Sequence, residues 1–351
     1  MRYVKAIRST VAALLAGGLL FLSGCGGKTT APDTIRIGVC LYQQDDTFIS
    51  TLVQDLELMA RDREQALGVK INLSVADGRG SQAAQNEQVD RFLTQGYDAI
   101  CVNIVDRTAA AVIIDKAQAA DVPVLFFNRE PVKEDLRRWD EAYYVGSPAD
   151  QAGRLQGEIV RAAWRDQSAA LDRNGDGVLQ YGMLEGEPGH QDTLLRTEYC
   201  VKVLSQANVT MEKLVSATAN WQRGQANTQV QRWLSQYSDQ LEVIFCNNDD
   251  MALGAIDACL DAGMAVEDLP FIVGVDATPP ALEAVAAGTL KGTVQNDAKG
   301  QAESLLDLFC ALALDQDPAQ AVPLKDGKYV WLSYRSVTKE NLSDFLPQSG
   351  T

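Results

Sequence analysis

The chain has 351 residues, of which 46% are hydrophobic, and its formal net charge is −16. A chain this acidic repels phosphate backbones, so its charge argues against nucleic-acid binding. The length and the apolar content are sufficient for two domains, each with its own hydrophobic core.

The N-terminus has the pattern of a secretory signal. Basic residues precede an apolar run at residues 11–22 that is too short to cross a bilayer comfortably. The run ends in LSGC, which resembles a bacterial lipobox in which Cys25 receives diacylglycerol. We therefore predict a lipoprotein signal peptide at 1–24, a flexible tether at 25–33 and an extracytoplasmic, membrane-anchored protein. An ordinary signal peptide that happens to contain a cysteine is the alternative.

Short β-branched runs then alternate with longer amphipathic segments, which is typical of repeated βα units around parallel sheets. In the first series we predict strands at 35–41, 69–75, 99–103 and 122–127, with helices at 47–67 and 108–120. In the second series we predict strands at 143–145, 181–184, 243–246 and 271–275, with helices at 150–164, 192–206, 222–236 and 251–262.

The fold class predicted from this alternation is α/β, with two doubly wound parallel-sheet lobes. The N-terminal lobe is expected to contain residues 34–142 and 296–330, and the C-terminal lobe residues 143–295 and 331–347. We expect the chain to cross between the lobes in three segments, near 128–143, near Asn296 and near 329–333.

Polar residues follow the predicted strands, and the carboxyl ends of parallel strands are where such sheets bind ligands. These residues are Asp46, Asn103, Asn128, Asn248 and Asp276. No G-x-G-x-x-G opens a helix after a strand and no Walker loop is present, so the sequence does not indicate a nucleotide cofactor.

Six cysteines remain besides Cys25, and in an exported chain they could form disulfides. They lie inside apolar strand-like or helix-like segments, and no C-x-x-C occurs. We therefore favour buried free thiols and predict no zinc site.

Residues 172–180, DRNGDGVLQ, reproduce the first nine positions of an EF-hand loop. Oxygen-bearing side chains fall at loop positions one, three, five and nine, and a glycine occupies position six. Position twelve is Met183 and not the usual bidentate glutamate, so a distant residue must complete the shell. An Asx-rich turn without a metal is the alternative interpretation.

Several stretches along the chain together resemble a known family. They are residues 45–48 (DDTF), 102–106 (VNIVD), 126–131 (FFNREP), 143–146 (YYVG), 186–190 (GEPGH), 247–249 (NND), 274–277 (GVDA) and 292–297 (GTVQND). The chain after the signal is similar to the periplasmic galactose/glucose-binding proteins of ABC sugar uptake and chemotaxis, within the type 1 periplasmic-binding-protein superfamily.

This resemblance implies a set of sugar contacts, and it also implies the ligands of a structural calcium ion. The implied sugar contacts are Asp46, Phe48, Asn103, His190, Asp192, Arg196, Trp221, Asn248, Asp276 and Asn296. The implied calcium ligands are Asp172, Asn174, Asp176, the carbonyl of Val178, Gln180 and Glu242. Glu242 would supply the carboxylate that Met183 lacks.

The chemistry of the implied sugar contacts suits a pyranose, whose hydroxyls both donate and accept and whose faces carry C–H groups. Each residue also has a structural interpretation when taken singly. Asp46 could be a helix cap, Phe48 and Trp221 could be core residues, and His190, the one histidine of the chain, could be structural.

We therefore expect a non-enzymatic, monomeric protein that captures D-galactose and D-glucose by hinge closure. The resemblance implies an ABC permease as partner and a chemoreceptor as a further one. A receptor for ribose, xylose or a signalling furanose is the alternative. A glycosidase fits less well, because the carboxylates are dispersed and not paired across a scissile bond. A sugar-responsive repressor is also a poor fit, because the sequence has no helix-turn-helix with which to bind DNA.

Overall fold

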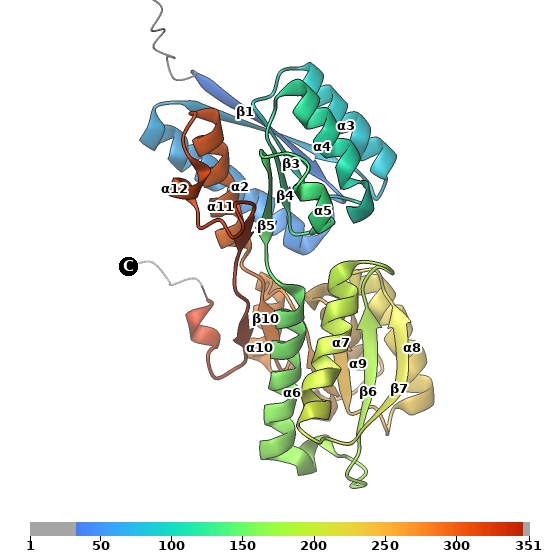
Figure 1. The fold of residues 1–351 in the computed structure, drawn as a ribbon. Helices are drawn as coiled ribbons and strands as arrows, with labels where there is room; N and C mark the ends of the chain where they lie inside the picture. Colours follow the sequence, from blue (N-terminus) through green and yellow to red (C-terminus); the bar gives the residue numbers. More distant parts are fainter. Residues whose placement is uncertain (1–32, 347–351) are drawn as a thin grey trace, which may run out of the picture. The chain divides into compact units, whose positions relative to one another are not determined.

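The computed structural model describes residues 33–346, and the predictions for the signal peptide, the tether up to residue 32 and Cys25 fall outside the described residues. Within that range the chain forms two lobes, each built on a parallel sheet (Figure 1). None of the helices in this range is long and apolar enough to cross a membrane.

The first lobe contains a six-stranded sheet in the order β11-β5-β4-β3-β1-β2, and every neighbouring pair is parallel. Its strands are β1 (Thr34–Leu41), β2 (Lys70–Asp77), β3 (Ala99–Val102), β4 (Val124–Phe127), β5 (Ala142–Gly146) and β11 (Tyr329–Trp331). Its helices are α2 (Thr47–Leu67), α3 (Gln82–Thr94), the 3-10 turn η1 (Arg107–Ala109), α4 (Ala110–Ala120), α5 (Lys133–Leu136), α11 (Ala298–Ala313) and α12 (Pro318–Ala321).

Helices cover both faces of this sheet, because successive side chains of a strand point to opposite faces. In β4, Leu125 and Phe127 pack in one buried cluster with α2 and α11, whereas Val124 and Phe126 pack in another with α3 and α4. Figure 1 shows these two helix layers on the two sides of the sheet. A strand buried on both faces needs a continuous apolar run, which is what its sequence VLFF provides.

The second lobe contains a four-stranded parallel sheet in the order β7-β6-β8-β9 and a short antiparallel pair, β10-β12. Its strands are β6 (Leu179–Glu185), β7 (Met211–Thr218), β8 (Val243–Cys246), β9 (Phe271–Val273), β10 (Thr293–Gln295) and β12 (Arg335–Val337). Its helices are α6 (Ala149–Leu171), α7 (Gln191–Gln206), α8 (Arg223–Tyr237), α9 (Asp249–Asp261), η2 (Val266–Asp268), α10 (Pro279–Ala287) and η3 (Leu342–Asp344).

The predicted lobe boundaries at residues 142/143 and 330/331 were wrong by a few residues. The run 143–145 was assigned to the second series, but β5 pairs with β4 and with β11 in the first sheet. The chain therefore leaves the first lobe at Ser147 and Pro148, not within 128–143. A buried apolar run fits either sheet by its pattern, and only its pairing decides between them. The second and third crossings lie at 296–297 and 332–334.

The six described cysteines are unpaired and buried, as predicted. Burial raises the pKa of each thiol above its usual range.

Helix α6 packs closely against α7 at Gly153. A Cβ atom at Gly153 would lie 2.8 Å from the carbonyl oxygen of Arg196 and 3.0 Å from its Cα, closer than non-bonded backbone and side-chain atoms approach. The glycine therefore sets the distance between the two helices, and with it the position of Arg196.

We expect Gly153→Ala to lower the free energy of unfolding. Overpacking costs about 1–3 kcal/mol, more than the 0.5–1 kcal/mol or so that alanine gains over glycine inside a helix. Gly224→Ala in α8 is the matched control, because a Cβ there meets no atom within 4 Å. Urea unfolding of the two variants measures the difference, and equal stability of both would contradict this packing argument.

Candidate functional site

A cavity lies between the two lobes, at the carboxyl ends of their strands. It is lined from the first lobe by Tyr42, Asp46, Phe48, Asn128 and Arg129, and from the second by His190, Asp192, Arg196, Trp221, Asn248 and Asp276. Most of the predicted sugar contacts therefore converge on one place, although they come from distant parts of the sequence.

Three of the lining side chains are also helix N-caps. Asp46 Oδ1 accepts from the backbone N–H of Ile49 at 2.9 Å, and Asn248 Oδ1 accepts from that of Met251 at 3.0 Å. His190 Nδ1 accepts from the backbone N–H of Asp192 at 3.0 Å, so the neutral ring carries its proton on Nε2. The cap interpretation of Asp46 is therefore correct, and it coexists with a place in the cavity wall.

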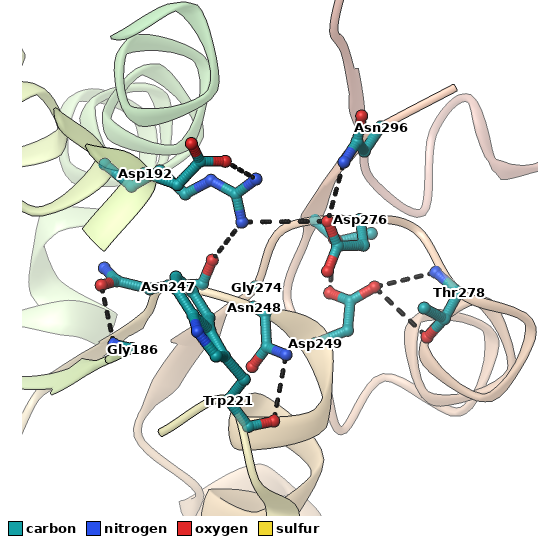
Figure 2. A network of polar contacts seen from close by, with 12 residues as sticks. Gly186, Asp192, Trp221, Asn247, Asn248, Asp249, Gly274, Asp276, Thr278 and Asn296 are labelled. Atoms are coloured by element: carbon teal, nitrogen blue, oxygen red, sulfur yellow. Dashed lines mark hydrogen bonds and ion pairs between the residues drawn. The ribbon is translucent and has the colours of Figure 1, made fainter. Parts of the chain in front are cut away.

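The charge at the centre of the site is the buried guanidinium of Arg196. It donates to Asp192 Oδ2 at 2.8 Å and to the carbonyl oxygen of Asn247 at 2.8 Å, and it lies 3.8 Å from Asp276 Oδ1 (Figure 2). It also donates to the hydroxyl of Tyr334 at 3.1 Å. Burial raises the pKa of both carboxyl groups, and the nearby guanidinium opposes this by stabilising their ionised forms.

Behind Asp276 lies a third buried carboxylate, Asp249. Its oxygens accept from the hydroxyl of Thr293 at 2.6 Å. They also accept from the backbone N–H of Thr278 at 2.9 Å (Figure 2). Burial raises its pKa, and these donors oppose the increase. Asp276 itself has a φ of 124°, a conformation that side chains other than glycine rarely adopt, so its backbone is strained where it meets the cavity.

Phe48 from the first lobe and Trp221 from the second line the cavity, and each belongs to the hydrophobic core of its own lobe. Phe48 is part of the first-lobe cluster and Trp221 of the second-lobe cluster. A Cβ atom at Gly186 would overlap the indole ring of Trp221, so only glycine fits beneath it. The ring lies edge-on to His190, with centroids 5.2 Å apart.

Several buried polar atoms at the site have no hydrogen-bond partner among the described residues. They include Trp221 Nε1, Arg196 Nε and Asn103 Oδ1. Buried donors and acceptors are nearly always satisfied in folded proteins, so such unmet groups indicate a polar ligand or ordered water. The free volume of the cavity is about 30 Å³, whereas one water needs roughly 10–15 Å³. As it stands in this structure, the cavity therefore has room for water but not for a sugar.

Asn103 and Asn296 are not among the residues that line the cavity. Asn103 Nδ2 donates to Phe127 O at 3.1 Å and to Asn128 Oδ1 at 3.3 Å, and Asn296 Nδ2 lies 3.4 Å from Asp276 Oδ1. Each therefore contacts a residue that does line the cavity.

Sequence reasoning missed Tyr42 and Arg129 and did not select Asn128 as a contact. The Arg129 guanidinium stacks on the Tyr42 ring at 3.5 Å from its centroid, and the Tyr42 hydroxyl donates to Asp46 Oδ2. The strand-end position of Tyr42 and the FFNREP stretch that contains Asn128 and Arg129 were the available signals.

Residues 37–317 match the sequence profile described as the periplasmic binding protein domain. The chain belongs to the type 1 periplasmic binding protein family. Its members are extracytoplasmic solute-binding proteins and not enzymes, which confirms the prediction of a non-enzymatic binding protein.

Two relatives cover nearly the whole chain. The D-galactose/methyl-galactoside binding periplasmic protein of Haemophilus influenzae is 38% identical over 97% of this chain and 98% of its own. A putative rhizopine-binding protein of Rhizobium meliloti is 32% identical over 90% of this chain and 94% of its own.

A solved structure also matches the fold. An ABC transporter solute binding protein from Bacillus halodurans with bound myo-inositol has a TM-score of 0.72 and 28% identity, and covers 90% of this chain and 98% of that one. The two-lobed α/β fold class predicted from the sequence is confirmed.

The predicted calcium loop lies in the second lobe of this binding protein, between α6 and β6. The carboxylate of Glu242, which is 1% exposed, accepts from the backbone N–H groups of Arg173 at 2.7 Å and Gln180 at 2.9 Å. Glu242 is therefore held at the loop although it is distant in sequence. Burial raises the pKa of Glu242 because it disfavours the ionised carboxylate, and a bound cation would stabilise that ionised form.

The donor set of this loop suits a hard cation, although the side chains of residues 33–346 form no ready cluster of three or more His, Cys, Asp or Glu around a metal position. The side-chain amides of Asn174 and Gln180 donate to Asp176 Oδ2 at 3.0 and 2.8 Å, and Gln180 Oε1 is buried without a partner. Both amides would turn over to offer their oxygens to a cation.

His190 allows a direct test of the site's electrostatics, because it is the one histidine of the chain. Burial, with the charges of Arg129, Arg196 and Arg107, lowers its pKa well below 6.5. Below pH 6.5 the imidazole of His190 therefore binds a proton in the unfolded chain but stays neutral in the folded protein. The His190 contribution to stability is therefore present above pH 6.5 and decreases as the pH is lowered below 6.5, by at most about 1.4 kcal/mol per pH unit.

In NMR spectra of the folded protein, we expect the imidazole signal to show no titration midpoint near pH 6.5. His190→Asn, which keeps a capping acceptor, should remove the corresponding pH dependence of unfolding. An imidazole that titrates with an ordinary midpoint in the folded state would show that the ring is hydrated and not held as described.

Proposed function

We propose that this binding protein captures D-galactose and D-glucose between its lobes and delivers the sugar to an ABC permease. The convergence of donors, acceptors and aromatic rings from both lobes on a single cavity carries the proposal. Two likenesses support it: the Haemophilus relative is a D-galactose/methyl-galactoside binding protein, and the Bacillus structure is an ABC transporter solute binding protein.

The side chains suit the hydroxyls of a pyranose. Carboxylates of Asp46, Asp192 and Asp276 would accept from hydroxyls, and Arg196 and the Nε2 proton of His190 would donate to them. Phe48 and Trp221 would cover the two C–H faces of the ring. A hydroxyl of the wrong orientation would leave a buried group unpaired, at a cost of about 1–3 kcal/mol.

Hinge closure follows from the division of the contacts. Since each lobe supplies part of the wall, a bound sugar stabilises the arrangement in which the lobes are together. The three crossing segments at 147–148, 296–297 and 332–334 are the places where the backbone can bend.

Isothermal titration with galactose, glucose, ribose, xylose and myo-inositol tests the assignment. We expect binding of the two hexoses, and a loss of about tenfold or more in affinity in Asp276→Asn and Trp221→Ala, since each removes a buried partner of the sugar. Asp307→Asn is the control, because its ion pair with Arg63 lies within the first lobe. Binding of a pentose or of myo-inositol with no response to either hexose would replace the proposed ligand.

We further propose that the loop at 172–180, completed by Glu242, holds one structural Ca²⁺. The ion would be bound by oxygens of Asp172, Asn174, Asp176, Val178, Gln180 and Glu242. The buried orphan oxygen of Gln180 and the anchored carboxylate of Glu242 support this. The role is structural, because the loop lies away from the residues that line the cavity.

Chelation should lower the melting temperature without abolishing sugar binding. Calcium at 100 times the Kd of its site contributes about 2.7 kcal/mol of stability. Each kcal/mol shifts the melting temperature by roughly 2–4 °C in domains of 150–250 residues. Asp176→Asn should make the melting temperature insensitive to calcium. Asp166→Asn, an exposed carboxylate of α6, should respond as the wild type does. A wild-type melting curve unchanged by chelator and by added calcium would rule out the site.

We also propose that Cys25 carries a lipid anchor, supported by the LSGC sequence at residues 22–25. Cys25→Ser should release the protein from the membrane fraction, and retention of the variant there would contradict the anchor.

A further inference from the structure

Three side-chain hydrogen bonds join the two lobes beside the sugar cavity. Thr47 Oγ1 donates to Asp250 Oδ2 at 2.6 Å. Arg129 Nη2 donates to Glu187 Oε2 at 3.0 Å. The third runs from Gln191 Nε2 to Glu130 Oε2 at 2.7 Å. In each pair one partner belongs to the first lobe and the other to the second, so each bond breaks when the lobes separate.

These bridges lie at two places on the rim of the cavity. Thr47 follows Asp46 at the start of α2, and Asp250 lies in the first turn of α9. The other two bridges lie beside His190: Glu187 is in the loop that precedes α7, and Gln191 is the first residue of α7. Of the bridging residues, only Arg129 lines the sugar cavity. The others can therefore be changed without removing a proposed sugar contact.

Burial makes these bonds stronger than ordinary surface pairs. The Arg129 side chain is 6% exposed and that of Glu187 is 33% exposed. Asp250 is sufficiently desolvated that its pKa is raised, and the hydrogen bond from Thr47 opposes the increase. Hydrogen bonds to ionised acceptors in such surroundings are stronger than neutral ones and are only weakly screened by salt.

Arg129 also connects its bridge to the sugar site. The guanidinium stacks on Tyr42, whose hydroxyl donates to Asp46, the carboxylate proposed to accept from a sugar hydroxyl. Arg129 donates in addition to the carbonyl oxygen of Val105 at 3.2 Å, which fixes it to the first lobe. Glu187 therefore engages a guanidinium that is already oriented.

We propose that these cross-lobe bridges set the equilibrium between open and closed lobes, and thereby determine sugar affinity through residues that do not touch the sugar. The proposal rests on the proposed function for its consequence on affinity. The apparent Kd of a protein equals its intrinsic value divided by the fraction that is competent to bind tightly. Removal of a bridge lowers the closed fraction, so it weakens binding chiefly by speeding release.

Two conservative variants each weaken one bridge. Thr47→Val is nearly isosteric and removes the hydroxyl donor, and Glu187→Gln removes the charge. Each has a matched control within one lobe. Thr51→Val removes a hydroxyl one turn further along α2 that bonds only to the carbonyl of Thr47, and Asp307→Asn removes the charge of an ion pair inside the first lobe.

Double electron–electron resonance between two spin labels, one on each lobe, measures the distance between the lobes in the absence of ligand. Labels are placed at Leu58→Cys on α2 and Leu260→Cys on α9, both exposed positions, in the full chain carrying Cys25→Ser. The six buried native cysteines leave the introduced thiols as the reactive ones. Thr47→Val and Glu187→Gln should each lower the population at the closed-lobe distance, and the double variant should lower it further. The two controls should match the parent. An unchanged distribution in the double variant overturns the proposal.

Stopped-flow release of galactose provides the second measurement. We expect each bridge variant to release the sugar about threefold to tenfold faster, and the controls to release it at the parental rate. Parental release rates in both bridge variants would overturn the link to affinity. If the parent binds no hexose, the proposed function fails, and the label distances still decide whether the bridges hold the lobes together.

Discussion

The buried charge of Arg196 is the interaction on which the site depends. A guanidinium removed from water costs several kcal/mol unless acceptors surround it. Its acceptors are Asp192 on its own helix, the carbonyl of Asn247 at the end of β8 and the hydroxyl of Tyr334 in the third crossing segment. Because elements far apart in sequence supply them, the polar wall of the cavity forms only when the second lobe is completely folded. Tyr334 also connects the bottom of the site directly to the hinge.

The helix caps explain why the remaining polar groups are already oriented. Asp46, His190 and Asn248 each satisfy the first turn of a helix, and this use fixes their rotamers before any ligand is present. A site built from caps therefore loses little side-chain entropy on binding. The same geometry places the starts of three helices against one cavity, where their partial positive ends favour the oxygen atoms of a sugar.

The sequence predicted the fold class and the strand-end residues of the site from local signals, whereas His190, Arg196 and Trp221 among others were implied by the family resemblance. Asp46, Asn248 and Asp276 follow apolar strand runs, and the ends of parallel strands meet at one edge. The edge strand β7 was not predicted, since its exposed positions break the apolar pattern. The first crossing was misplaced because a short buried run fits either sheet. Tyr42 and Arg129 were missed because their positions near strand ends are signals that many residues share, and the contact between them joins residues far apart in sequence.

The burial of every described cysteine limits when the sulfur chemistry of this protein can occur. Each thiol lies inside a packed lobe and is held protonated, so the folded chain offers oxidants almost no reactive thiolate. A wrong cross-link can therefore arise only in the interval between export and folding. In the folded chain it is the burial of these thiols, and not a set of disulfides, that protects them from oxidation.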